Sequence, residues 1–248
     1  MPSAPPASPS KFDPTQRWAD STHGRRLTSL EREEVARHLP ELFGRHFLQI
    51  GAWGGEGDWL SGSEMLHRAV LAVGKQPGAQ ARVDAQHLPL ASKSVDAVLL
   101  PHTLELVRSP HRLLRETSRV LSDRGRLLLV GFSPWGSLAW RRRVGLAPRA
   151  LPGSSRYYSA GRVCDWLSLL DFEVLEVRRF GVGFPWLPAR SDGNPFTPAS
   201  LFQVFSEAYL VAAKKRVTPL TLVGQRSRAQ VKPLIGLPGV AAHRDGSQ

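Results

Sequence analysis

The sequence predicts a doubly wound α/β fold built on a mostly parallel sheet. Two apolar runs of strand length, residues 95–100 (VDAVLL) and 126–132 (RLLLVGF), are bounded by turn residues, as expected of strands covered on both faces. Between them Ser109 is a plausible helix N-cap and Pro110 suits the first helical position. The apolar face of that helix is formed at i, i+3, i+4 spacing by Leu113, Leu114, Thr117, Val120 and Leu121. With a turn at residues 123–125, this is one right-handed βαβ unit.

Shorter apolar segments predict the remaining elements. Thr28 and Glu31 form a capping box for a helix running to about Leu39, and Ser159 is the expected N-cap of a later helix whose inner side holds Val163, Trp166, Leu167 and Leu170. Five further strands are predicted at residues 47–50, 69–73, 80–83, 173–179 and 208–213.

Length and composition indicate one globular domain with tails. The chain has 248 residues, of which 42% are hydrophobic, enough for a substantial core. We expect a disordered leader at residues 1–27, the domain at 28–216 and a basic flexible tail at 217–248. No apolar run reaches the ~20 residues of a membrane span, and the amino terminus has no signal-peptide pattern. We therefore expect a cytoplasmic protein. The single cysteine, Cys164, allows no internal disulfide, and we expect no metal site.

The positive charge is concentrated in the second half of the chain. Lys and Arg exceed Asp and Glu by 17 to 14 in residues 1–131 and by 16 to 7 in residues 132–248, which together give the net +12. This excess is compatible with nucleic acid or an acidic substrate. It is equally the pattern of a solvated, arginine-rich tail. Because basic and aromatic residues are not interleaved as in single-strand binders, nucleic acid stays possible but is not favoured.

Three segments carry a resemblance to a known family. Asp84-Ala85 followed by Leu88-Pro89, then residues 95–105 (VDAVLLPHTLE), then residues 109–132 resemble the later motifs of class I S-adenosylmethionine-dependent methyltransferases of the methyltransferase domain 11 type. Residues 110–121, 166–175 and 214–222 resemble uncharacterised bacterial methyltransferase-like proteins, and the similarity covers most of residues 30–222. It implies a Rossmann-like sheet of seven strands with an antiparallel last strand, S-adenosyl-L-methionine as cofactor, and a methyl acceptor as substrate.

The resemblance assigns the turn after the first strand to the methionine end of the cofactor. The expected residues are Gln49, Gly51, Ala52, Trp53 and Gly55. Family members have an acid at the place of Gln49 and a glycine at that of Trp53, because bare backbone allows close approach. The acid that normally accepts from the ribose hydroxyls is also missing, since the second strand is followed by Gly74-Lys75-Gln76.

The resemblance assigns the adenine end to a loop after the third strand. Asp84 would accept from the adenine amino group, and the backbone of Ala85 would reach a ring nitrogen. Gln86 adjoins them, and Leu88 would pack against the ring. The alternative is a turn aspartate that caps a short helix.

The end of the fourth strand supplies the candidate catalytic residue. Pro101 and His102 lie where open α/β sheets bind ligands, and the near-neutral pKa of histidine suits a general base. His102 would otherwise only pack on the cofactor or cap a helix. Asp96 is expected to be structural.

Three functions follow. The first is an enzyme, a methyltransferase acting on a small-molecule acceptor, with residues 133–140 as a lid and 180–200 as a substrate-covering flap. The second is a catalytically silent methyltransferase fold that binds a ligand or partner, motivated by Gln49 and Trp53. The third is an RNA or protein methyltransferase, motivated by the basic second half. The sequence does not indicate the oligomeric state.

Overall fold

A computed structural model of the chain describes residues 19–53, 59–73, 79–136, 139, 156–181 and 206–216. The chain divides into two units after Val217, and the second unit lies outside the described residues. So do the expected leader up to residue 18, part of the expected lid, most of the expected flap, Gly55, and the residues at 74–76.

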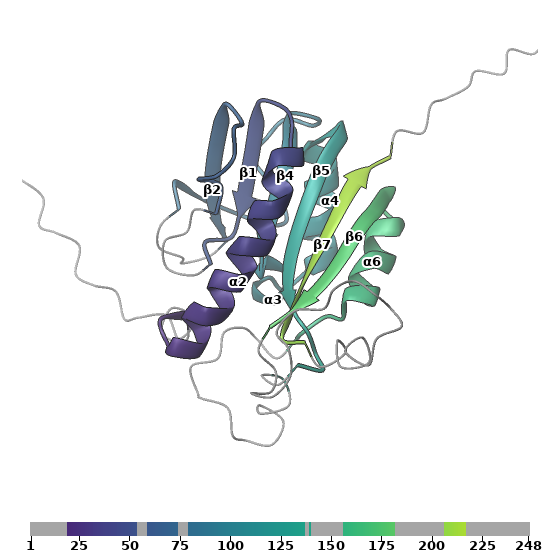
Figure 1. Cartoon of the computed structure of the whole chain (residues 1–248). Coiled ribbons are helices and arrows are strands. Elements are labelled where there is room, and N and C mark those ends of the chain that lie inside the picture. The colour runs from purple at the N-terminus through teal and green to yellow at the C-terminus, as the bar shows by residue number, and fades with distance from the viewer. Residues whose placement is uncertain are drawn as a thin grey trace, which may run out of the picture. The chain divides into compact units, whose positions relative to one another are not determined.

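One sheet of seven strands organises the described part of the chain (Figure 1). Its order is β3-β2-β1-β4-β5-β7-β6. All neighbouring pairs are parallel except the two that involve β7, which runs antiparallel to β5 and to β6. The strands are β1 His46–Ile50, β2 His67–Val73, β3 Ala81–Val83, β4 Val95–Pro101, β5 Leu121–Phe132, β6 Phe172–Phe180 and β7 Ala208–Lys215. The predicted fold class, including the antiparallel last strand, is confirmed.

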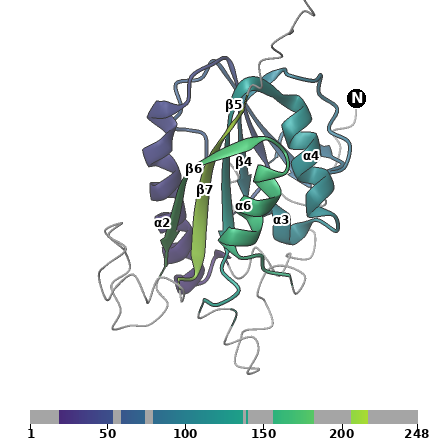
Figure 2. The same ribbon diagram turned by 90° about the vertical axis from the view of Figure 1, so that its right-hand side faces the viewer.

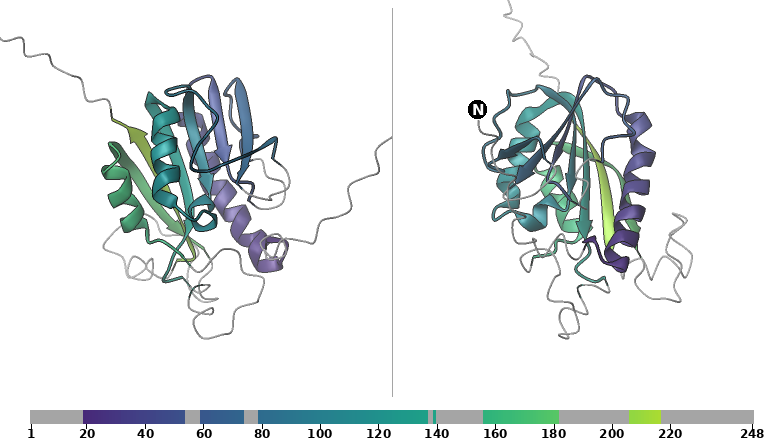
Figure 3. Two further views of the ribbon diagram at one scale, coloured as in Figure 1. Left: turned by 180° about the vertical axis from the view of Figure 1, so that it is seen from behind. Right: turned by 90° about the vertical axis from the view of Figure 1, so that its left-hand side faces the viewer.

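Helices cover both faces of this sheet. Helix α2 (Thr22–His38) and the short 3₁₀ turn η1 (Leu39–Glu41) lie on one face, and α3 (Thr103–Leu106), α4 (Pro110–Val120) and α6 (Ala160–Ser168) lie on the other (Figures 2 and 3). Alternate residues of the central strands therefore enter two cores. In β4, Val98 and Leu100 belong to the core under α4 and α6, whereas Ala97 and Leu99 belong to the core under α2. Burial on both faces explains the continuous apolar runs of β4 and β5.

The first helix begins earlier than the capping box predicts. The N-cap of α2 is Ser21, whose side chain accepts from the N–H of Gly24 at 3.0 Å. Thr28 and Glu31 lie inside the helix and are buried, so the predicted capping box is wrong. Both side chains face the core under α2, and this tertiary packing outweighs the local capping signal.

Helix α4 and the strand after it also differ in detail from the prediction. Helix α4 begins at Pro110 after Ser109 as predicted, although the Ser109 side chain makes no capping hydrogen bond. It ends at Val120, and residues 121–125 already belong to β5. The predicted turn at 123–125 is therefore the start of a strand, since Leu121 pairs with Val95 ahead of a register shift.

Two crossovers of the parallel sheet hold no helix in their described residues, although such connections usually contain one. Residues 51–66 join β1 to β2, and the described ones among them contain no helix. Residues 74–80 join β2 to β3. The described residues 51–53 and 59–66 therefore place no helix amino terminus behind β1. In the part of the chain that the structure describes, no helix is long and apolar enough to cross a membrane.

Candidate functional site

The carboxyl ends of β1, β4 and β5 form one edge, where open α/β sheets place their ligands. Gln49 pairs with Leu99, and Pro101 pairs with Val130. These registers align the ends of the three strands, so the turn after Ile50 lies beside His102 and Phe132. The predicted methionine-end residues and the candidate base are therefore brought together.

Gln49 braces the turn that follows its own strand. It is fully buried, its amide nitrogen donates to the carbonyl oxygen of Gly51 at 2.8 Å, and its amide oxygen accepts from the backbone N–H of Trp59 at 2.9 Å. An amide supplies a donor and an acceptor at once, which a carboxylate does not. The glutamine thus holds both ends of the residue 51–59 connection, a role in this loop that an acid at this position would not fill.

Gly51 occupies a position that admits no side chain. Its φ is +102°, and a Cβ atom would lie 2.6 Å from Oγ1 of Thr103. That hydroxyl donates to the carbonyl oxygen of Ile50, which ties the first residue of α3 to the end of β1. Ala52 follows, half-buried. The structure therefore requires glycine at position 51 because Thr103 of the protein itself lies close to its backbone.

Trp53 turns into the core under α2 and crosses the ends of the central strands. Its side chain is 1% exposed. The ring centroid lies 4.4 Å from that of His102 and 5.5 Å from that of Phe132, and Nε1 donates to Oε2 of Glu31 at 3.3 Å. The indole therefore fills the space above β4 and β5 at this edge.

A buried charged cluster surrounds the candidate base. His102 is 1% exposed and has a left-handed backbone with φ 50°, a conformation that histidine tolerates better than most residues. Its Nε2 lies 2.8 Å from Oε1 of Glu31, and its Nδ1 lies 3.7 Å from Oε1 of Glu105, an oxygen that also accepts from the N–H of Phe132 at 2.7 Å. The two carboxylates, Glu31 and Glu105, are also buried.

The carboxylates determine the charge of His102. Burial is the largest single effect and lowers the pKa of the imidazole, but Glu31 and Glu105 together outweigh it and raise the pKa to about 9. At neutral pH the ring is an imidazolium that bridges α2 to the end of β4. A protonated ring accepts no proton, so these contacts favour the packing alternative. The role of general base stays a prediction.

The predicted adenine loop lies apart from this cluster and is open to solvent. Asp84 is exposed, and its two oxygens accept from the N–H of Gln86 at 2.9 Å and face Nδ1 of His87 at 3.2 Å. These hydrogen bonds lower the pKa of the carboxyl group, so it is ionised at neutral pH. Ala85 and Leu88 of the same loop are buried in the core under α4 and α6. The loop thus combines an exposed carboxylate with buried apolar side chains.

Three residues of the edge were not found by sequence reasoning. Glu31 had been assigned to a helix cap, while Thr103 and Glu105 had no assigned role. The spacing of His102 and Glu105, one helical turn apart, was a visible signal for that pair. Nothing local connects either of them to Glu31, 71 residues earlier.

Comparison with known proteins agrees with this architecture. Residues 62–129 match the family model described as a methyltransferase domain. Sheet order, antiparallel last strand and this match define a class I S-adenosylmethionine-dependent methyltransferase fold.

The chain belongs to the same family as the uncharacterized protein YafS of Escherichia coli. The two are 36% identical over 205 residues, which cover 83% of this chain and 82% of YafS. A similar mycobacterial protein, Rv2003c of Mycobacterium tuberculosis, is 32% identical over 65% of this chain and 58% of its own length, and is likewise described as uncharacterized.

Solved structures share the fold. A methyltransferase of Archaeoglobus fulgidus that depends on S-adenosylmethionine superposes with a TM-score of 0.58 at 16% identity, over 81% of this chain and 97% of that one. Geranyl diphosphate methyltransferase, solved with GPP and sinefungin, gives 0.52 at 15% identity, over 79% and 81%. Identities this low establish the fold alone.

S-adenosylmethionine is the cofactor of this family, and the edge fits its two ends unequally. The Asp84 loop suits adenine, since it holds an ionised, exposed carboxylate close in sequence to the buried apolar residues Ala85 and Leu88. At the methionine end, the place that the resemblance reserves for bare backbone holds the indole of Trp53. The residues therefore fit the adenine ring, and the methionine moiety fits only with the indole displaced.

Proposed function

We propose that this protein transfers the methyl group of S-adenosylmethionine to a small-molecule acceptor at the carboxyl edge of the sheet. The observation that carries the proposal is the Asp84 loop. It presents an ionised, exposed carboxylate next to the buried apolar residues Ala85 and Leu88 at the end of β3, in a sheet that has the family's full strand order.

In this proposal the chain acts mainly by positioning. The bound cofactor supplies a methyl group that its positively charged sulfur has already activated. Asp84 accepts from the adenine amino group, the N–H of Ala85 reaches a ring nitrogen, and Leu88 supports the ring. Holding two reactants in line contributes roughly 7–11 kcal/mol to lowering a barrier. Trp53 leaves its place beside His102 and Phe132 and returns as a wall that excludes water.

Calorimetric titration with S-adenosylmethionine and with S-adenosylhomocysteine tests the proposal. We expect saturable binding of both, weakened by about tenfold or more in Asp84→Asn because a charge-assisted hydrogen bond becomes a neutral one. Asp123→Asn is the matched control, an exposed aspartate on β5 that pairs with Lys93 at 2.7 Å. Absence of heat at millimolar cofactor contradicts the proposal, and so does an equal loss of affinity in the control.

A second candidate, a catalytically silent fold, is favoured by one specific observation. The indole and the imidazolium both contact the carboxylate of Glu31, and the imidazolium lies 3.7 Å from Glu105, so these groups hold one another at the methionine end without a cofactor. This candidate predicts no binding of S-adenosylmethionine by the wild-type protein. Saturable binding by the wild-type protein contradicts it, whereas binding by Trp53→Ala alone does not.

A further inference from the structure

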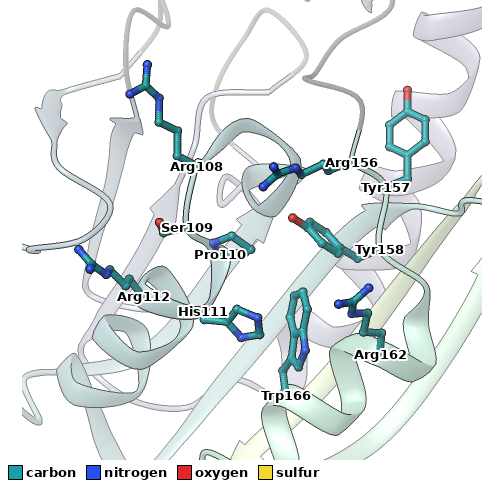
Figure 4. A pocket seen from close by; sticks show the side chains of 10 residues that line it. All are labelled: Arg108, Ser109, Pro110, His111, Arg112, Arg156, Tyr157, Tyr158, Arg162 and Trp166. Atoms are coloured by element: carbon teal, nitrogen blue, oxygen red, sulfur yellow. The ribbon is translucent and has the colours of Figure 1, made fainter.

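A cavity of about 690 Å³ opens between the amino-terminal ends of α4 and α6. Its volume is that of a site for a small organic molecule. One wall is the start of α4, residues 108–112, and the other is formed by residues 156–158 together with Arg162 and Trp166 of α6. Figure 4 shows Arg156 and Tyr158 extending from the second wall toward Ser109 and Pro110 on the first.

The charge lining this cavity is entirely positive. Four arginines, Arg108, Arg112, Arg156 and Arg162, line it together with His111, and no carboxylate is among the described lining residues. None of these arginines forms an ion pair with a described acidic residue. The neighbouring sequence supplies no acid either, because between Asp123 and Asp165 it holds eight arginines and no Asp or Glu.

Aromatic rings form the floor beside these charges. The ring of Trp166 lies 4.1 Å from that of His111 and 4.9 Å from that of Tyr158, centroid to centroid. The guanidinium of Arg162 lies over the same indole at 5.4 Å, which fixes one cation beside an aromatic surface. A ligand that fits such a lining carries negative charge next to a planar ring.

The cavity also adjoins both parts of the candidate site. Arg112 donates from Nη1 to Oε1 of Gln86 at 2.6 Å, next to the Asp84 loop. On the other side, Tyr157 lines the cavity, and its ring lies 5.5 Å from that of Phe132, the residue against which Trp53 packs.

We propose that this cavity binds a small organic phosphate, a phosphate monoester with a planar ring. Guanidinium groups match the oxygens of phosphate two at a time, and several of them favour a dianion over a carboxylate. The binding of this anion does not depend on the proposed function. The anion would also be the methyl acceptor, and that second role rests on the proposed function.

Calorimetry on the full-length protein, without cofactor, tests the binding. The probes are phenyl phosphate, inorganic phosphate and benzoate. We expect phenyl phosphate to bind more tightly than either, since only it carries both the dianion and the ring, and its affinity to fall as salt is raised. Benzoate binding as tightly as phenyl phosphate overturns the assignment to phosphate. Lack of saturable phenyl phosphate binding at millimolar concentration overturns the site.

Matched variants locate the binding. Arg156→Gln and Arg162→Gln are each expected to weaken phenyl phosphate by about tenfold. Arg115→Gln is the control, because Arg115 is exposed on α4 but does not line the cavity. An equal loss in the control shows non-specific attraction to a basic surface and overturns the site. Retained S-adenosylmethionine binding in Arg156→Gln then separates failure of this site from failure of the proposed function.

Discussion

The buried Glu31–His102–Glu105 cluster makes a quantitative prediction about stability and pH. The folded-state pKa of His102 is raised from 6.5 to about 9. A group whose pKa is raised on folding contributes stability that is fully present below its unfolded pKa and is lost as the pH rises through the folded pKa. The shift corresponds to roughly 3 kcal/mol, or about 6–12 °C in melting temperature for a domain of this size. We expect this loss between pH 6.5 and 9.

Urea unfolding at a series of pH values measures the loss, and NMR titration of the imidazole measures the pKa of His102 itself. His102→Gln is expected to be less stable at pH 6.5, with its pH dependence flattened, because two buried carboxylates lose their cation. In Glu31→Gln the loss moves to lower pH, since one carboxylate has become neutral. His111→Gln, which alters an exposed histidine outside the cluster, keeps the wild-type profile. Constant wild-type stability over this range refutes the reasoning, as does an unchanged slope in His102→Gln.

Two further predictions concern the turns around β1. Gly51→Ala is expected to destabilise the protein by at least about 1–3 kcal/mol in urea unfolding, because alanine is strained at φ +102° and its Cβ meets Thr103; unchanged stability contradicts this. Asp96→Ala is expected to cost roughly 1 kcal/mol, because one carboxylate oxygen accepts from the N–H groups of Arg45 at 2.8 Å and His46 at 3.1 Å. A faster hydrogen exchange of these two amides checks the second case, and unchanged protection refutes it.

Strands and helices with strong local signals could be predicted from the sequence. The apolar runs of β4 and β5 are buried on both faces of the sheet, so their composition alone predicts that they are central strands. Pro110 is tolerated only at the start of a helix, and α4 begins there. Asp96 was expected to be structural, and its carboxylate fastens the start of β1.

The site could be predicted only in part, because its main contacts are not local. The family resemblance placed Gln49 and Trp53 at the ligand edge, and the position of His102 at the end of the fourth strand placed it there as well. It could not show that the Trp53 indole turns toward α2, since that depends on Glu31, 22 residues earlier. The capping box failed for the same reason. Thr28 and Glu31 have the residue types of a cap, but their burial in the core decides their position.

Trp53 gives the prediction that most sharply separates the two candidate functions. Full burial of a tryptophan contributes about 3–5 kcal/mol relative to alanine. If the indole must leave for the methionine end to enter, that stabilisation opposes binding, because only the open population is competent. Trp53→Ala should therefore be less stable by about this amount and yet bind S-adenosylmethionine at least about tenfold more tightly.

Trp59→Ala is the matched control, because a loss of stability alone is not informative. Trp59 is also buried, at 4% exposure, and its Nε1 donates to the carbonyl oxygen of Trp53 at 3.1 Å. Its removal should destabilise the same core without removing the indole that lies beside His102 and Phe132. Calorimetry on both variants, at a temperature where urea unfolding shows them folded, gives the comparison. Opposite changes in stability and affinity in Trp53→Ala alone identify the indole as an obstacle to the cofactor. If Trp53→Ala binds no more tightly than wild type, the indole does not occupy the methionine position, and the proposed displacement is wrong.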